Sequence, residues 1–298
     1  MNTRFAISVL LISSVGWGLT WLPIKAMNEM GLDSMQLIFI AFLSATLLLL
    51  PWLYKQYPAW KGRIYIMLMI GLCGGIANAA FQTAIFHGEV IRVMILFYLL
   101  PVWSVLGGKL FLKEKIDAVR LFAVVVCLTG AFVILEVWNT SWQGFSWIDL
   151  VAISSGMALA ATNILFRFSQ DIPLVSKVST MFMGCTVIIG VSMLVMPMNQ
   201  AIPGYGVMFL AAAYGAIWLT VITLGTQWGV TQLEAGRSSI IIVMELVVAV
   251  VSVAVLTSAE LKLYEFIGGL MVISAAVLET SRSDDSLIDC PVTDESAN

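Results

Sequence analysis

The chain has 298 residues, of which 60% are hydrophobic and only 11% are charged, and its formal net charge is −3. Soluble domains carry roughly 25% charged residues, so this composition excludes an ordinary soluble protein and favours one that spans a membrane. His87 is the single histidine, and the four cysteines form no closely spaced pair. We therefore expect no metal site and no cofactor.

Apolar stretches long enough to cross a bilayer recur along the whole chain. They predict ten transmembrane helices, at about residues 5–27, 34–53, 64–86, 90–111, 117–136, 147–168, 174–196, 205–229, 236–257 and 264–280. The first stretch lacks the small-residue cleavage site of a signal peptide, so we expect it to be retained. Pro23 and Pro101 predict a bend in the first and fourth helices. Residues 281–298 are rich in carboxylates and predict a disordered, acidic cytoplasmic tail.

The basic residues indicate how the helices are oriented. If the N-terminus is cytoplasmic, the inside segments contain 12 of the 15 Lys and Arg residues, and the outside segments contain only Lys25, Arg92 and Lys262. Such a bias predicts that both termini are cytoplasmic. We expect a multi-pass plasma-membrane protein, such as one of the bacterial inner membrane. The lipid bilayer is then a partner and nucleic acid is not, while monomer and homodimer both remain open.

Two stretches of the sequence, residues 88–115 and 233–262, are similar to each other. Each begins with a carboxylate and an arginine three residues apart and ends with a glutamate: Glu89, Arg92 and Glu114 in the first, and Glu234, Arg237 and Glu260 in the second. The second set is shifted by 145 or 146 residues, which indicates two related halves, residues 1–140 and 141–280. Five helices in each half, an odd number, make the second repeat inverted, an arrangement that favours transport.

Short motifs lie at defined places in the first half: Trp17-Gly18 with Lys25 in the first helix, Leu100-Pro101-Val102 in the fourth, Glu114 after it, and Gly130 late in the fifth. On these motifs the chain resembles the drug/metabolite transporter superfamily in its ten-helix EamA-type branch. The second half departs from the family, with Met244-Glu245-Leu246 where a proline is usual. The resemblance implies an all-α integral membrane protein, with ten transmembrane helices as two inverted five-helix repeats around a central cavity. It also implies metabolite transport, often amino-acid export.

Glu245 lies near the middle of the ninth predicted helix, where a charge costs about 2.5–3.5 kcal/mol. Ser238, Glu245 and Ser252 are seven residues apart and therefore share one helical face. One interpretation is a protonatable carboxylate, or one that binds the ammonium group of a substrate. The other is a protonated side chain bonded to a neighbouring helix. Because intramembrane acids are usually functional, we favour the first.

The first helix has a similar face, formed by Ser14, Gly18, Trp21 and Lys25. Gly18 permits the close approach of another helix. Lys25 is expected near the outer end, where it pairs with an acid, meets a substrate carboxylate, or extends its ammonium group to the membrane surface. These interpretations stay open at this stage.

The third helix combines small and polar residues on one face. Gly71 and Gly75 form a GxxxG pattern that predicts helix packing. Asn78 and Gln82 follow on the same face, and they either bind substrate or make hydrogen bonds between helices. Arg92, at the start of the fourth helix, either pairs with a nearby glutamate or points into the mouth of the cavity.

Several aromatic residues fall near the middle of predicted helices, where indole N–H and phenol O–H groups need partners. Aromatic walls suit a substrate with an apolar part, although ordinary helix packing explains them equally well. With the polar residues, including Asn163 of the sixth helix, they complete the candidate substrate-binding set: Trp17, Trp21, Lys25, Asn78, Gln82, Arg92, Tyr98, Trp103, Asn163, Tyr214, Trp218 and Glu245.

Together these patterns predict a secondary transporter that moves small amphiphilic metabolites by alternating access. Aromatic or neutral amino acids are the expected exported substrates, and proton coupling through Glu245 is an open option. The chain has no Walker A motif, and it lacks the mid-helix residues of an intramembrane enzyme, so we expect no enzymatic activity. Two alternatives remain: a non-transporting receptor or assembly subunit, and an exporter of nucleosides, sugars or cationic drugs.

Overall fold

A computed structural model describes residues 3–140, 144–195, 204–257 and 260–281. Within these ranges the chain is helical and contains no strand. The all-α membrane class expected from the composition is therefore confirmed. Apart from Ser281, the predicted acidic tail lies outside the described residues.

Nine helices of the described ranges, several of them broken into segments, are long and apolar enough to cross a membrane. They are α1 and α2 (Thr3–Gly18, Trp21–Glu29), α3 (Ser34–Lys55), α5 (Ile64–His87), α6 and α7 (Val90–Phe97, Leu100–Leu112), α9 (Trp147–Phe168), α10 (Leu174–Val195), α11, η3 and α12 (Tyr205–Ala213, Tyr214–Leu219, Thr220–Gln232), α13 and α14 (Ala235–Ile242, Met244–Thr257), and α15 (Leu263–Thr280). The remaining predicted helix is the shorter apolar α8 (Ala118–Ile134). Three short turns complete the chain: α4 (Tyr57–Trp60), η1 (Lys61–Arg63) and η2 (Val137–Asn139).

Proline explains two of the breaks. Pro23 has no N–H for the carbonyl of Leu19, which instead accepts from Leu22 N at 3.1 Å, and the first span divides into α1 and α2. Pro101 leaves the carbonyl of Phe97 without its helical donor, and α6 ends at Phe97. Both predicted bends are thus confirmed.

Two further irregularities occur without proline. The ninth span is interrupted at Val243, between α13 and α14, and the eighth contains a six-residue π-helix, Tyr214–Leu219. A π-helix inserts an extra residue into the helical repeat and often lies at functional sites. The sequence pattern predicted each of these spans as a single continuous helix.

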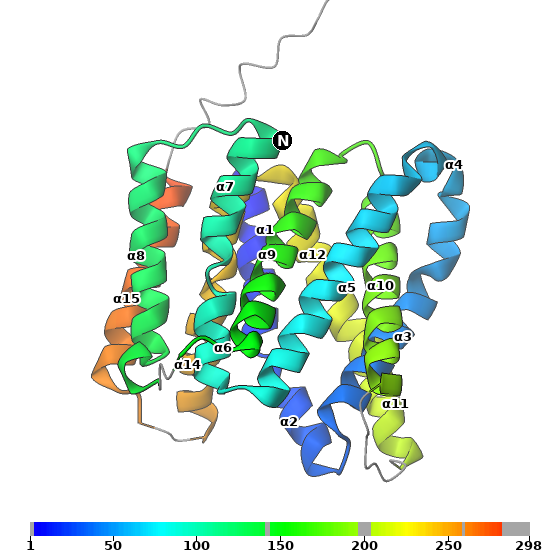
Figure 1. Cartoon of the computed structure of the whole chain (residues 1–298), viewed down its shortest axis with the longest axis horizontal. Helices are drawn as coiled ribbons and strands as arrows, with labels where there is room; N and C mark the ends of the chain where they lie inside the picture. The colour runs from blue at the N-terminus through cyan, green and yellow to red at the C-terminus, as the bar shows by residue number, and fades with distance from the viewer. Residues whose placement is uncertain (1–2, 141–143, 196–203, 258–259, 282–298) are drawn as a thin grey trace, which may run out of the picture.

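Close helix packing depends on glycine. A Cβ atom at Gly75 would lie 2.7 Å from the carbonyl oxygen of Gly184, so the GxxxG pattern packs α5 against α10 as predicted. α8 lies along α15 (Figure 1), and there a Cβ atom at Gly130 would lie 2.7 Å from the carbonyl oxygen of Gly268. Glycine at these positions permits backbone contact between helices.

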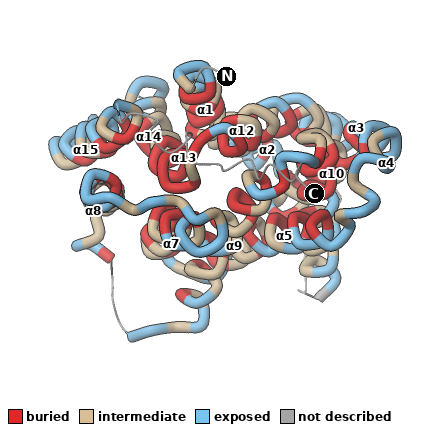
Figure 2. Tube along the Cα trace, turned by 90° about the horizontal axis from the view of Figure 1, so that it is seen from above, coloured by how far each residue is buried: buried red, intermediate tan, exposed pale blue. Residues whose placement is uncertain are grey.

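The bundle has two end faces. The start of α1 and the loop between α7 and α8 lie at one end, which we call the terminal face, and α2 lies at the opposite face (Figure 1). Seen from above, buried residues turn towards neighbouring helices and exposed ones turn outwards (Figure 2). Many of the exposed side chains are large and apolar, such as Leu110, Phe209 and Val255. A protein surrounded by lipid is expected to have such a surface.

Candidate functional site

Two helix breaks meet near the middle of the bundle. Tyr98 lies in the break between α6 and α7, and Glu245 is the second residue after the break between α13 and α14. The hydroxyl of Tyr98 donates to Oε1 of Glu245 at 3.1 Å. Tyr98 is buried and Glu245 is half-buried. Transporters commonly bind substrate at such discontinuous helices, because the breaks leave polar groups available at membrane depth.

The first span lies directly against Glu245. A Cβ atom at Gly18 would lie 2.6 Å from the backbone oxygen of Glu245, so only glycine permits this approach. The indole nitrogen of Trp21 donates to Oγ of Ser252 at 2.9 Å. The polar face predicted on the ninth span is thus covered by the first span. Trp17 bonds a different helix, since its indole nitrogen donates to Oγ1 of Thr226 in α12 at 3.0 Å.

A shallow cavity of about 750 Å³, widely open to the outside, runs along one face of α2 at the opposite face of the bundle. Its lining residues are Thr20, Trp21, Ile24, Lys25, Asn28 and Glu29. Nζ of Lys25 lies 4.0 Å from Oε1 of Glu29, and both side chains are largely exposed. Neither Tyr98 nor Glu245 lines this cavity. Trp21 connects them, because it lines the cavity and bonds the helical face that carries Glu245.

The predicted amide residues lie between helices. Nδ2 of Asn78 donates to the carbonyl of Gly74 at 2.9 Å and to Sγ of Cys185 in α10 at 3.3 Å. Asn163 of α9 accepts a hydrogen bond of 3.1 Å from Gln227 of α12. Gln82 is half-buried on α5. Asn78 therefore makes the interhelical bond that was the alternative to substrate binding, and Asn163 makes an interhelical bond as well.

Arg92 is held at the start of α9. Its Nε donates to Oδ1 of Asp149 at 2.7 Å, and Nη2 donates to the carbonyl of Gly144 at 2.7 Å. Asp149 also accepts from the backbone nitrogen of Ser146, and so caps α9. The structure thus uses Arg92 to join α6 to α9.

The other aromatic candidates lie on α7 and on the π-helix. Tyr214 is buried in an apolar cluster, against which Trp218 also packs. The indole nitrogens of Trp103 and Trp218 are buried and have no hydrogen-bond partner among the described residues. Buried indole N–H groups favour a polar partner. Trp103 and Trp218 pack against two different apolar clusters, and neither of these clusters contains Tyr98.

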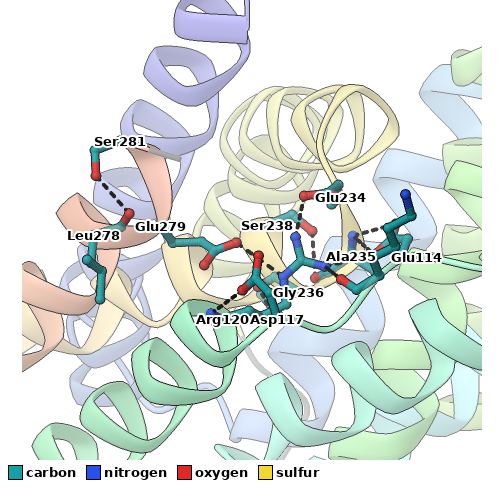
Figure 3. Close-up of polar contacts among 12 residues, drawn as sticks. Glu114, Asp117, Arg120, Glu234, Ala235, Gly236, Ser238, Leu278, Glu279 and Ser281 are labelled. Atoms are coloured by element: carbon teal, nitrogen blue, oxygen red, sulfur yellow. Dashed lines mark hydrogen bonds and ion pairs between the residues drawn. The ribbon is translucent and has the colours of Figure 1, made fainter. Parts of the chain in front are cut away.

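The structure also contains a cluster of charged side chains that the sequence did not predict. Arg120, at the start of α8, lies among Glu114, Glu234 and Glu279 at the terminal face (Figure 3). Arg167 also bonds Glu114. We call these five side chains the terminal-face network. The sequence contained one signal for it, since Arg120 and Glu279 both fall inside predicted apolar spans. Opposite charges inside two spans are expected to find each other.

Comparison with known proteins agrees with this fold. Residues 4–136 match the family model of the EamA-like transporter family. No curated protein sequence matches the chain significantly. Among the solved structures, 29 chains match. One of them, titled only "Crystal structure of protein", superposes with a TM-score of 0.72 at 13% identity and covers 92% of this chain and 97% of its own. At that identity the likeness shows the fold alone. The predicted EamA-type resemblance is confirmed.

Proposed function

We propose a specific transport activity for this chain, whose residues 4–136 match the family model of EamA-like transporters. It exports small amphiphilic metabolites, foremost amino acids with aromatic or neutral side chains, by alternating access. The observation that carries this proposal is the hydrogen bond between Tyr98 and Glu245 where two broken spans meet. A hydroxyl and a carboxylate at membrane depth form a polar site inside an apolar bundle.

The chemistry of the site favours a substrate with a cationic amine and an apolar part. The carboxylate of Glu245 binds an ammonium group, and the hydroxyl of Tyr98 positions that carboxylate. The buried indole nitrogens of Trp103 and Trp218 supply donors beside aromatic rings. Lys25, in the cavity along α2, provides a cation for the substrate carboxylate as it reaches the opposite face.

Two inverted repeats, residues 1–140 and 141–280, remain part of this proposal. The breaks at Tyr98 and Val243 are 145 residues apart, and so are the first residues of α8 and α15. The same shift relates the paired charges of the sequence. In transporters built this way, exchanging the conformations of the two repeats opens a central site to alternate sides of the membrane. In the orientation that the basic residues favour, the terminal face is cytoplasmic.

Counterflow of labelled amino acids in proteoliposomes tests the proposal, with the parent chain compared with Glu245→Gln and Tyr98→Phe. We expect saturable exchange in the parent, driven by a pH gradient if Glu245 carries the coupling proton. Glu245→Gln should abolish the response to the pH gradient. It should also reduce the rate of exchange at least about tenfold, the factor that corresponds to losing one hydrogen bond to a charged group. Tyr98→Phe should mainly raise the concentration for half-maximal exchange.

Asp171→Asn is the matched control, because this exposed carboxylate lies outside the site and forms an ion pair with Arg63. It should leave exchange unchanged. Parental exchange and gradient response in Glu245→Gln would reduce Glu245 to a helix-packing role. If no amino acid exchanges at all, the substrate class is wrong, and nucleosides, sugars and cationic drugs are tested next.

A further inference from the structure

Arg120 is the centre of the terminal-face network (Figure 3). Its side chain is 1% exposed; its Nε lies 3.3 Å from Oε1 of Glu279, Nη1 lies 3.8 Å from Oε2 of Glu114, and Nη2 pairs with Glu234. Nη1 also donates to the carbonyl of Lys115 at 3.1 Å. A guanidinium group has five donors in a fixed plane, and here they are directed to partners on several sides.

Glu114 ties the network to the start of α13. Both of its carboxylate oxygens lie 3.0 Å from the backbone nitrogen of Ala235, and Oε1 also accepts from Nε of Arg167 at 2.9 Å. A carboxylate at a helix N-terminus satisfies an otherwise unpaired N–H group. α13 is therefore held here twice, through Ala235 and through Glu234.

Glycine brings these segments together. A Cβ atom at Gly236 would lie 3.0 Å from Cδ of Arg120, and one at Gly108 would lie 2.7 Å from Oε2 of Glu114. The network thereby joins the ends of the fourth, fifth, sixth, ninth and tenth spans at one face. A further bond at this end links the eighth span, since Gln170 donates to the carbonyl of Thr231 at 3.2 Å.

The opposite face is different. There α2 lines the 750 Å³ cavity. The ion pairs of Lys25 with Glu29 and of Lys262 with Glu136 involve lysines that are 59% and 60% exposed. Among the described residues at this end, Arg92 and Asp149 form a buried ion pair. The terminal face also has a hollow, of about 430 Å³, whose lining includes Lys113, Arg167 and Gln170. The two faces therefore differ in the buried ion network, which joins five span ends at the terminal face.

We propose that the terminal-face network is the closed gate of the transport cycle, with Arg120 as the positioning residue that holds α13 shut. This inference rests on the proposed alternating access. α13 leads directly into the break at Val243, and Glu245 follows just after it in α14. A passage from Glu245 to the terminal face therefore requires α13 to leave Glu114 and Arg120. A position of α13 between closed and open would leave a buried charge without its partner, which is strongly disfavoured. The gate therefore has two defined conformations.

Formal charge favours Glu234 as the member that leaves. The network contains three carboxylates and two guanidinium groups. When α13 moves, it carries away Glu234 and its own buried Arg237, and two charges of each sign stay behind in the network. Glu234 then enters water at the face, where a carboxylate needs no partner. The opening step therefore leaves a balanced buried cluster.

Cysteine labelling of the full chain in nanodiscs tests the gate without any substrate. A background without the four native cysteines receives either Ser239→Cys, at a fully buried position of α13, or Ile24→Cys, in the cavity along α2. A hydrophilic maleimide then reports the access of water to each position. Because a nanodisc exposes both faces, the orientation of the protein does not matter.

We expect Arg120→Gln and Glu234→Gln each to raise the labelling rate at position 239 about tenfold, within the usual range of coupling between conformational states. Labelling at position 24 should fall in the same variants, because opening one face closes the other. Arg120→Lys, which keeps the charge, should stay closer to the parent. Arg63→Gln is the matched control, since its exposed ion pair with Asp171 lies outside the network and both rates should be parental.

Parental labelling at position 239 in folded Arg120→Gln and Glu234→Gln would overturn the gate. So would the failure of both variants to fold, because the network would then be needed for assembly of the helices. Labelling also separates this inference from the proposed function. If the gate opens as expected and no amino acid exchanges, the substrate class is wrong and the gate stands; exchange with unchanged labelling overturns the gate alone.

Discussion

Single side chains of this protein stabilise helix ends inside the bundle. Lys177 of α10 is fully buried, and its Nζ donates at 2.8 Å to the carbonyls of Phe166 and Ser169. These carbonyls lie at the C-terminal end of α9, where a helix has unpaired acceptors. A cation there also interacts favourably with the helix dipole. This role cannot be predicted from the sequence near Lys177, because both of its partners lie in the preceding span or just after it.

Replacing Lys177 by Met keeps a side chain of similar length and removes both hydrogen bonds. We expect the free energy of unfolding to fall by about 1–3 kcal/mol, the cost of leaving buried acceptors unpaired. Thermal unfolding in detergent, followed by tryptophan fluorescence, measures the change. Lys61→Met, at an exposed position of the same face, should leave Tm nearly unchanged. Equal Tm values for the two variants would refute the capping role.

Glu136, just after α8, titrates differently from an isolated glutamate. Hydrogen bonds from Tyr264 and from Lys262 lower the pKa of its carboxyl group. A lowered pKa contributes stability above the ordinary pKa of glutamate, and this stability is lost as the pH falls through the lowered value. Glu136→Gln should therefore reduce Tm at pH 7 more than at pH 3. Glu260→Gln, at an exposed position shortly before α15, is the control; an equal effect of Glu136→Gln at both pH values would contradict the assignment.

The candidate site lies where broken spans meet. Only some of these breaks are caused by a residue within the span itself. Pro23 and Pro101 could be interpreted from the sequence, because a proline removes one backbone donor wherever it stands in a helix. The break at Val243 and the π-helix at Tyr214–Leu219 contain no such residue. They depend on contacts between spans, such as the close approach of Gly18 to the backbone of Glu245. Those contacts cannot be predicted from the periodicity of the sequence.

Pro101→Ala restores a donor for the carbonyl of Phe97 and should join α6 to α7. A continuous helix would move Tyr98 away from Glu245, so we expect counterflow to fall at least about tenfold, as for a lost hydrogen bond to a charged group. Thermal stability should be unchanged or higher. Pro51→Ala is the matched control, because Pro51 lies inside α3 without interrupting it. Parental transport by Pro101→Ala would show that the break does not position the site.

At the scale of the whole molecule, the sequence was sufficient to predict the spans and the family resemblance, but it did not predict the contacts between the spans. The observed spans begin and end within a few residues of the predicted ones, because apolar length alone defines them. The sequence predicts Glu245 as a charge inside an apolar span, but it does not predict the bond to Tyr98, which joins residues 147 positions apart. The network around Arg120 is equally long-range, since it depends on five helix ends meeting at one face.

The edge of the bundle formed by α8 and α15 has a consequence for the surrounding lipid. With 17 and 18 residues, these helices are about 26 and 27 Å long, against a hydrocarbon core of about 30 Å. A bilayer beside short helices becomes thinner, at a modest cost for each ångström of mismatch. Arg120 and Glu279 lie at the terminal-face ends of this pair, so the thinned lipid brings headgroups and water closest to the gate. For the proposed gate, the length of the lipid acyl chains is therefore a physical variable that the membrane sets and the protein does not.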